Sequence, residues 1–232
     1  MRFSLALLLS LSFAGFISAE SRVIAVSVDN VVHPVTVEIL THAIDQAKRE
    51  RAAFLLIRLN TPGGLLEATR QAIQKIVASP VPVVTFVTPS GGRAASAGFF
   101  LLESGDIAAM ADGTNAGAAS AVLPGGQQMD PVLRKKVDSD AAALLRGLVS
   151  KRGRNPDLTE KAVFEAKSFS DREALENRLI DLVASDEQHL LAQLDGRAVV
   201  RFGGRRETLR LARATGSGLQ PDHPGTDSHV HQ

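Results

Sequence analysis

The sequence predicts an α/β domain in which most strands are parallel. Apolar runs of strand length alternate with segments whose apolar residues recur at helical spacing, a pattern typical of a parallel sheet covered by helices. Two glycine-rich corners each stand between such a strand and the next helix, where α/β proteins build their sites. The chain has 232 residues, 44% hydrophobic and 22% charged, which fits one main globular domain.

The first residues are typical of an export signal and not of the folded domain. Arg2 supplies a positive start, residues 3–17 are apolar apart from serines and one glycine, and Ala19 offers a small residue for cleavage. We therefore expect residues 1–19 to be a signal peptide or an N-terminal anchor, with a buried first helix as the alternative. The protein would then be exported, to the periplasm or the outer face of the cytoplasmic membrane. No later segment reaches the roughly 18 uninterrupted apolar residues of a membrane span.

The first half of the folded part alternates strands and helices. Residues 23–28 form a predicted buried strand, and residues 35–51 carry apolar side chains at helical spacing. The remaining predicted strands are 54–59, 81–87 and 106–111, and the remaining predicted helices are 65–78 and 94–104. The corners at 61–64 and 90–92 interrupt the pattern after the second and third strands.

The second half is more helical. Asp130 followed by Pro131 is a good N-cap and first helical residue, so a long helix is predicted to run to about Arg152. The other predicted elements are helices at 159–166 and 171–177, a strand at 179–183, and a hairpin that joins 198–202 to 206–211 through Gly203-Gly204.

Composition excludes several classes of function. The formal net charge is only +1, so no strong basic field favours nucleic acid as a partner. The chain has no cysteine, which excludes thiol catalysis and cysteine-based metal sites. We expect neither a metal nor another cofactor.

Both glycine-rich corners carry groups that acyl transfer requires. In LNTPGGLLEA, Gly63 and Gly64 let the backbone approach a ligand closely and present free N–H groups. In TPSGGRAASAG, Ser96 is expected within the first turn of a helix, where the N–H of Ala97 has no helical partner. A serine oxygen beside such groups can attack a carbonyl while the N–H groups hold the oxyanion. The alternative is that these small residues only pack a helix against the sheet.

A base for Ser96 has to come from a distant part of the sequence. None of the six histidines lies between Ser96 and His189, so a Ser-His-Asp triad of the usual forms is poorly supported. A lysine can replace the histidine where burial lowers its pKa enough for the amine to accept a proton.

The predicted long helix offers two lysines, Lys135 and Lys136. At about 100° per residue, its apolar stripe runs through Leu133, Val137, Leu144 and Leu148. Lys136 flanks this stripe and Lys135 points nearly opposite, so the spacing selects Lys136 as the candidate base. The alternative is that both lysines are solvated. Asp140, one turn further on, could orient Lys136, although a close carboxylate would oppose its role as a base.

Four stretches of the sequence occur in an order that is specific to one family. They are LNTPGG, RAASAG, DIAAMADGTNAGAA and KKVDSDAAALLRGLVSKRGRN. Together they resemble the NfeD-type membrane-bound serine proteases, relatives of the proteolytic subunit of Clp protease in the crotonase-like superfamily. The resemblance implies a spiral of ββα units with mostly parallel strands. It also implies a Clp-like protease domain at 20–195. From the residue pattern itself we expect a hairpin at 196–213 and then a polar tail at 214–232, rich in Gly, Pro, Asp and His and therefore disordered.

The resemblance further implies a role for each candidate residue. Ser96 corresponds to the nucleophile and Lys136 to the general base of a Ser–Lys dyad. Gly64 and Ala97 correspond to the backbone donors of the oxyanion hole, and Gly63 shapes the corner. The implied substrate is a hydrophobic segment of a stomatin-like membrane protein. Self-association, as a homodimer or a larger oligomer, is implied as well.

The sequence departs from the family pattern in three places. Asn60 stands where Asp is common, and residues 118–122 replace a stretch that often contains a His-Pro pair. The chain ends in a polar tail where longer relatives continue into membrane helices and a small β-barrel, so we expect a short form attached to a membrane, if at all, by its N-terminus. Two alternatives stay open: a catalytically silent scaffold that binds a membrane protein, and a coenzyme A thioester enzyme of the crotonase type, which an export signal disfavours.

Overall fold

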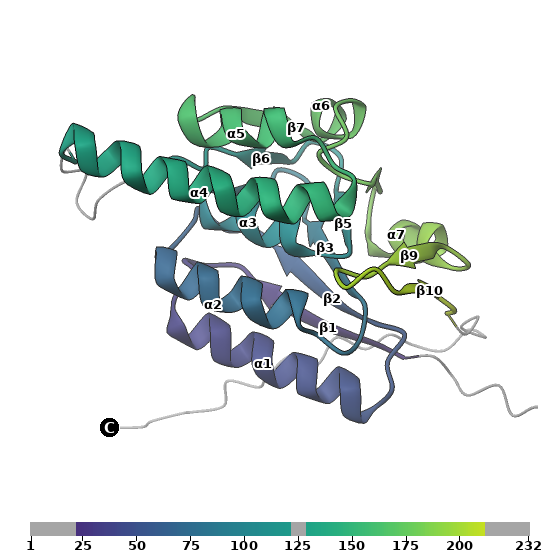
Figure 1. Cartoon of the computed structure of the whole chain (residues 1–232). Coiled ribbons are helices and arrows are strands. Elements are labelled where there is room, and N and C mark those ends of the chain that lie inside the picture. Colours follow the sequence, from purple (N-terminus) through teal and green to yellow (C-terminus); the bar gives the residue numbers. More distant parts are fainter. Residues whose placement is uncertain (1–21, 122–128, 212–232) are drawn as a thin grey trace, which may run out of the picture.

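The fold is organised around a five-stranded parallel sheet. The computed structural model describes residues 22–121 and 129–211. The sheet has the order β1-β2-β3-β5-β8, and every neighbouring pair is parallel (Figure 1). Its strands are β1 (Val23–Val28), β2 (Phe54–Leu59), β3 (Val83–Val87), β5 (Ile107–Met110) and β8 (Leu182–Val183). The predicted α/β fold with mostly parallel strands is confirmed.

Side chains alternate between the two faces of this sheet, and different elements cover each face. In β2, residues 55, 57 and 59 belong to one apolar core and residues 54 and 56 to the other. The first core includes side chains of α1 (Pro34–Arg49), α2 (Leu66–Val77) and α3 (Ala97–Ser104). The second core includes side chains of α7 (Glu187–Leu194) and of the antiparallel hairpin β9 (Ala198–Val200) and β10 (Arg206–Thr208). Strands β2, β3 and β5 are thus buried on both faces, as parallel strands usually are.

A smaller second sheet continues the chain beyond the carboxyl ends of the main strands. It contains β4 (Arg93–Ala95), β6 (Asn115–Gly117) and β7 (Ser168–Ser170), with β4 and β6 parallel and β7 antiparallel to β6. Two isolated parallel bridges, Val32 with Gly64 and Thr61 with Ala94, extend this arrangement to the segments that follow β1 and β2. Each of the first four main strands is therefore followed by a short extended segment and then by a helix. This repeat is the expected spiral of ββα units.

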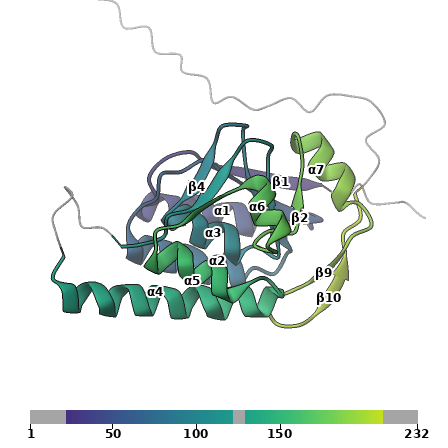
Figure 2. The ribbon, with the colours of Figure 1, turned by 90° about the horizontal axis from the view of Figure 1, so that it is seen from above.

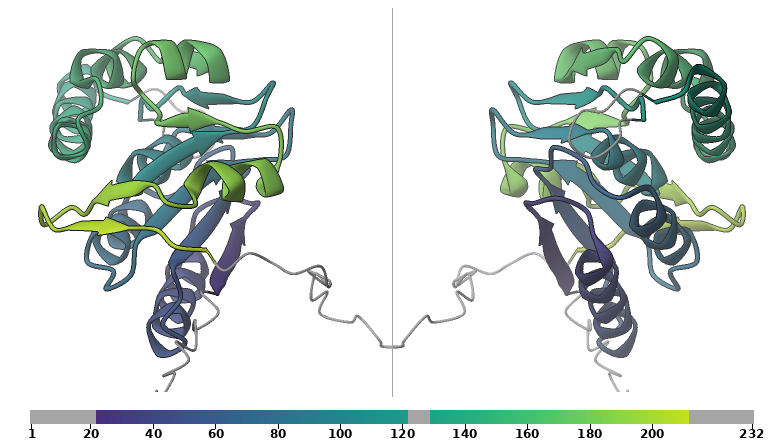
Figure 3. Two further views of the ribbon diagram at one scale, coloured as in Figure 1. Left: turned by 90° about the vertical axis from the view of Figure 1, so that its right-hand side faces the viewer. Right: turned by 90° about the vertical axis from the view of Figure 1, so that its left-hand side faces the viewer.

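Three later helices lie together at the end of the molecule opposite α1 (Figures 1 and 3). They are α4 (Pro131–Arg152), α5 (Pro156–Phe164) and α6 (Asp171–Glu176). The Asp130 side chain accepts from the N–H groups of Val132 and Leu133, each at 3.0 Å, so the predicted N-cap of the long helix is confirmed. The first turns of α4 extend beyond the rest of the domain (Figure 2).

Several predicted boundaries were wrong, each for a local reason. The predicted helix at 94–104 begins only at Ala97, because residues 93–95 pair with β6 as strand β4. The predicted strand at 179–183 shortens to Leu182–Val183, because the N–H groups of Leu179 and Ile180 bond back to Ala174 at the end of α6. Strands β6 and β7 and helix α7 were not predicted. The predicted hairpin forms at its expected place.

Two predictions lie outside the described residues: the signal peptide or anchor at 1–19 and the polar tail at 214–232. Within the described residues, no helix combines the length and the apolar character needed to cross a membrane.

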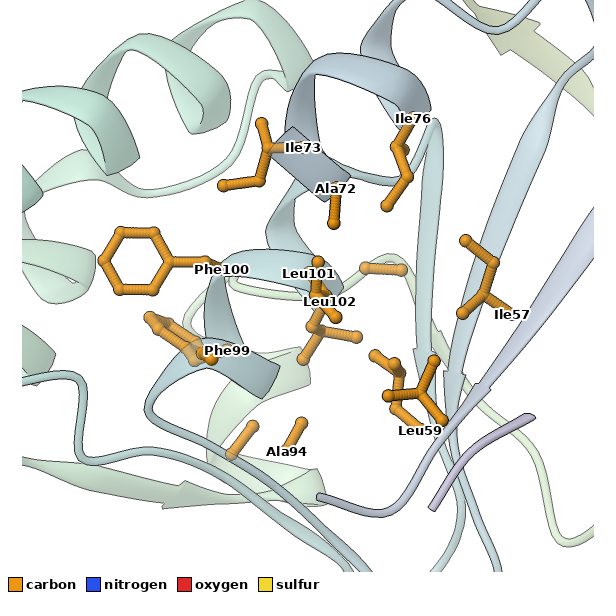
Figure 4. Close-up of a cluster of buried hydrophobic side chains, with 14 of the residues drawn as sticks. Ile57, Leu59, Ala72, Ile73, Ile76, Ala94, Phe99, Phe100, Leu101 and Leu102 are labelled. Atoms are coloured by element: carbon orange, nitrogen blue, oxygen red, sulfur yellow. The ribbon is translucent and has the colours of Figure 1, made fainter. Parts of the chain in front are cut away.

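Helix α3 is buried on every side and anchors the corner before it. All eight of its residues are buried, including the polar pair at its end. Phe99, Phe100 and Leu102 pack in one cluster with Ile73 of α2 and Leu59 of β2 (Figure 4). Because this cluster is part of the main core, the residue that starts α3 has a fixed position.

Arginine and carboxylate side chains close the amino-terminal edge of the main sheet. Arg154, which follows α4, donates to Glu103 of α3 at 3.2 Å and to Asp181, which precedes β8, at 2.7 Å. Arg201 of the hairpin donates to Asp106, which precedes β5, at 3.0 Å. The last arginine of α4 pairs with the same Asp106 carboxylate. This charged cluster joins α3, α4 and the hairpin to the starts of two strands.

Candidate active site

The first glycine-rich corner is shaped by contacts that leave no room for side chains. The Thr61 hydroxyl accepts from the N–H of Gly63 at 3.1 Å. Gly63 has a φ of +128°, and a Cβ added to it would lie 2.8 Å from the Cβ of Ser96. A Cβ added to Gly64 would lie 2.2 Å from the carbonyl oxygen of Val32. Gly63 therefore lets the corner pack directly against Ser96, and Gly64 lets it pack against the backbone of Val32.

Ser96 occupies a strained turn between β4 and α3. Its backbone angles are φ 51° and ψ −114°, a combination that costs a non-glycine residue energy. Its N–H donates to the carbonyl of Gly117 at 2.8 Å, and its carbonyl accepts from the N–H of Phe99 at 3.0 Å. Ser96 is thus the N-cap residue that precedes α3, so the prediction that it lies within the first turn of the helix was wrong. A serine on a sharp strand-to-helix turn presents its hydroxyl in the manner of a hydrolase nucleophile.

Ser96 lines a cleft of about 350 Å³, together with Gly64 and Ala97. Within residues 22–121 and 129–211, neither the N–H of Gly64 nor that of Ala97 donates to a backbone or side-chain acceptor. The other lining residues, mostly apolar, are Leu65, Leu66, Thr69, Phe100, Ala119, Ser120, Ala121, Val137 and Ala141. In such an apolar cleft the hydroxyl can attack a carbonyl group, and the two unbonded N–H groups can stabilise the oxyanion that forms.

A base for Ser96 has to come from outside this lining, which includes no histidine, lysine or carboxylate. In the described part of the chain, no three His, Cys, Asp or Glu side chains cluster closely enough to hold a metal ion. Lys136, the predicted base, is exposed, whereas its neighbour Val137 lines the cleft. Lys136 lines an open hollow on the outer side of α4, together with Lys135 and Asp140. The structure therefore brings Ser96 and the two candidate N–H donors together and leaves Lys136 outside the cleft.

The predicted apolar stripe of α4 was wrong at its start. Leu133 is 48% exposed, because the first turns of α4 extend beyond the domain (Figure 2), whereas Leu148 is buried as predicted. The buried residues of α4 are Asp138, Ala141, Ala142, Leu145, Leu148 and Val149. Asp140, a candidate to orient Lys136, pairs instead with Arg70 of α2.

Sequence reasoning missed two contributors to the cleft region. Phe100 lines the cleft from the first turns of α3, and its spacing of four residues from Ser96 could have indicated this position. Asp138 is the first buried residue of α4, although a carboxylate was not expected in an apolar stripe. Its spacing of three and four residues from two buried alanines is the signal that could have found it.

The comparison with protein families covers nearly all of this architecture. The model of the family described as NfeD1b, N-terminal domain, matches residues 22–192. The chain belongs to this family. The matched range contains both glycine-rich corners and the whole of α4, so every candidate site residue lies within the NfeD1b domain.

Two curated relatives are similar in sequence. The membrane-bound protease PH1510 of Pyrococcus horikoshii is 29% identical over 213 residues, which is 90% of this chain and 48% of that protein. The membrane protein NfeD1b of Bacillus subtilis is 29% identical over 137 residues, 59% of this chain and 30% of that protein. The chain thus spans about half the length of the first relative and less of the second.

Solved structures confirm the fold over most of both chains. A serine-to-alanine mutant of the 1510-N membrane-bound stomatin-specific protease superposes with a TM-score of 0.79 at 28% identity, over 88% of this chain and 99% of the other. A lysine-to-alanine mutant of that protease, in complex with a substrate peptide, superposes with a TM-score of 0.77 at 29% identity, over 83% and 89%. The NfeD1b domain therefore has the fold of a peptide-binding protease domain.

Proposed function

We propose that this NfeD1b domain is a serine endopeptidase with Ser96 as nucleophile and Lys136 as general base. The observation that carries the proposal is the strained Ser96 turn in one cleft with the unbonded N–H groups of Gly64 and Ala97. Strain at a non-glycine residue persists where surrounding structure enforces it, and such residues concentrate at active sites. The mutants made in the similar protease, one of a serine and one of a lysine, are consistent with such a dyad.

The proposed reaction follows the acyl-enzyme route. The neutral amine of Lys136 accepts the proton of the Ser96 hydroxyl while the oxygen forms a bond to the scissile carbonyl carbon. The N–H groups of Gly64 and Ala97 hold the oxyanion. The ammonium of Lys136 then gives its proton to the leaving amine as the C–N bond breaks. Water, deprotonated by Lys136, attacks the ester, and the proton returns to Ser96.

The dyad requires a movement of α4 or of the Lys136 side chain. Lys136 is exposed and outside the cleft, while Val137, the next residue, already lines it. The first turns of α4 extend beyond the rest of the domain (Figure 2), and residues 131–136 are all exposed. Bound peptide would give this segment a surface to pack on, which would bring the amine towards Ser96 and exclude water.

The substrate proposed is a hydrophobic segment of a membrane-associated, stomatin-like protein. The apolar lining of the cleft supports an apolar substrate, and the similar protease of known structure is called stomatin-specific. We also propose export to the periplasm or the outer membrane face and assembly into a homodimer or larger oligomer. A fusion of residues 1–19 to a reporter enzyme active only after export tests the first proposal, and light scattering tests the second.

Labelling with a fluorophosphonate tests the proposed chemistry. The wild type should be labelled covalently and Ser96→Ala should not, because the phosphonate bonds only to an activated serine oxygen. Lys136→Ala should lose at least about 100-fold in labelling rate, as removal of a general base does. Lys135→Ala is the matched control and should label like the wild type. Undiminished labelling of Lys136→Ala would refute the dyad.

A catalytically silent scaffold is the second candidate, favoured by the exposed position of Lys136. In that case the cleft would bind a partner segment without cleaving it. The wild type would resist every fluorophosphonate, and Ser96→Ala would bind the partner as the wild type does.

A further inference from the structure

We infer that Asp138 is a positioning residue that fixes one wall of the cleft to α4 and so determines how an extended peptide binds, an inference that rests on the proposed protease function. Asp138 is only 7% exposed and is the first buried residue of α4. The other buried positions of that helix hold only alanine, leucine and valine. Burial of a carboxylate costs free energy unless its charge is balanced and its oxygens accept hydrogen bonds. The partners of Asp138 therefore explain why an aspartate is buried at this position.

The two carboxylate oxygens of Asp138 have different partners. Oδ1 accepts from the N–H of Ala121 at 3.3 Å. Oδ2 lies 3.4 Å from Nε of Arg134, one turn earlier on the same helix, whose side chain is 47% exposed. The arginine balances the charge from the solvent side, within the helix. Of these two contacts of Asp138, only the one with Ala121 joins α4 to another segment of the described chain.

That segment is a wall of the cleft. Residues 119–121 line the same cleft as Gly64 and Ala97. The N–H of Ala119 donates to the carbonyl of Ala162 in α5 at 2.7 Å, and the N–H of Ala121 donates to Asp138 in α4. The wall is thus anchored to two different helices. Without the carboxylate, its anchor to α4 is lost and the N–H of Ala121 is left without its acceptor.

Asp138 also stands between the two residues by which α4 lines the cleft. Val137 precedes it, and Ala141 follows one turn later on the same buried side. One side chain therefore joins two walls, the α4 wall and the 119–121 wall. An extended peptide has to contact both walls, whereas a compact reagent needs only the proposed Ser–Lys dyad and the N–H donors. Asp138 should accordingly matter for extended reagents and not for compact ones.

Labelling rates of Ser96 with two reagents test this role. Diisopropyl fluorophosphate is the compact reagent, and a tripeptidyl diphenyl phosphonate with valine next to the phosphorus is the extended one. In Asp138→Ala the rate with the peptidyl phosphonate should fall about 10-fold, the usual effect of one lost hydrogen bond of this kind. The rate with diisopropyl fluorophosphate should stay within about 2-fold. Asp138→Asn keeps an oxygen for the N–H of Ala121 and should restore the peptidyl rate to within about 3-fold of the wild type.

The matched control is Ser139→Ala, which changes an exposed neighbour of Asp138 on the same helix and should change neither rate. Asp138→Leu continues the apolar stripe and replaces Asp138→Ala if that variant does not fold, with the same expectation. Equal losses with both reagents, no loss with either, or an Asn variant as slow as the Ala variant would each overturn the role of Asp138.

The proposed function and this inference fail in different ways. A wild type that reacts with neither reagent refutes the proposed nucleophile, and the inference falls with it. A wild type that reacts only with diisopropyl fluorophosphate keeps the nucleophile but refutes the binding role of the two walls.

Discussion

The carboxyl and amino ends of the main sheet differ in the kind of residues that they gather. At the carboxyl end, small residues, a strained Ser96 and unbonded N–H groups surround a cleft. At the amino end, the charged cluster around Arg154 and Asp106 fills the corresponding space with paired side chains. The cleft leaves two backbone N–H groups free beside a serine, whereas the charged side chains at the other end pair with one another. This contrast separates a region suited to chemistry from one suited to stability.

Removal of Arg154 should give the largest loss of stability. Its guanidinium donates to Glu103, to Asp181 and to the carbonyl of Gly105, and its side chain is only 2% exposed. Arg154→Met leaves two carboxylates without this partner, so the free energy of unfolding should fall by about 3–5 kcal/mol. Denaturant unfolding measures it, with Arg146→Met, an exposed arginine of α4, as the control. A loss no larger than that of the control would remove the contrast between the two ends.

The pH dependence of stability should reveal Glu103. Burial raises the pKa of Glu103 from 4.5 to about 7, although the Arg154 charge opposes this. In the described structure its Oε1 has no hydrogen-bond partner, which suits a protonated acid. At a pH between these two pKa values, Glu103 holds a proton in the folded state that it has released in the unfolded state. The stabilising contribution of Glu103 is therefore complete below pH about 4.5 and is lost as the pH rises to about 7.

Glu103→Gln isolates this effect because the amide stays neutral at every pH. Relative to the variant, the free energy of unfolding of the wild type should fall by about 3 kcal/mol between about pH 4 and about pH 8. Urea unfolding at both pH values measures the difference. Parallel profiles of the two proteins would show that Glu103 titrates normally and that its surroundings are more polar than the structure implies.

The contrast also explains what the sequence could and could not predict. Gly63, Gly64, Ser96 and Ala97 were found because each corner is local: a strand, a glycine turn and a helix start within about ten residues. The charged cluster at the other end joins residues as far apart as Glu103 and Asp181, and no local pattern marks them as partners.

The buried side of helix α4 was also beyond what the sequence could predict. Its N-cap and length followed from Asp130, Pro131 and the apolar spacing, but the buried side depends on what lies opposite each turn. In the described part of the chain, residues 131–136 are all exposed, Leu133 among them. The N–H of Ala121 lies opposite Asp138, so a carboxylate is buried there. Strands β6 and β7 have three residues each and exist only through their pairing.

Relief of strain at Ser96 should produce a smaller effect of the opposite sign. Ser96→Gly and Ser96→Ala both remove the hydroxyl, but only glycine adopts φ 51° and ψ −114° without cost. The glycine variant should therefore be more stable than the alanine variant by about 1 kcal/mol, after the entropy cost of glycine is counted. Thermal unfolding of the two inactive variants measures this. A less stable glycine variant would mean that the turn holds no strain, and the carboxyl end would lose its distinguishing property.

The smallest effect should come from the ion pair between Arg70 and Asp140, which joins α2 to α4 on the rim of the cleft. The Asp140 side chain is 64% exposed and that of Arg70 is 29% exposed, so water and salt screen their attraction. Asp140→Asn should lower the free energy of unfolding by no more than about 0.5 kcal/mol, and the loss should vanish in about 1 M salt. Chemical denaturation at two salt concentrations measures it. A loss comparable to that of Arg154→Met would mean that α4 depends on charge at both ends of the sheet. In that case the position of Lys136 would be fixed by this pair, and the movement proposed for catalysis would have to break it.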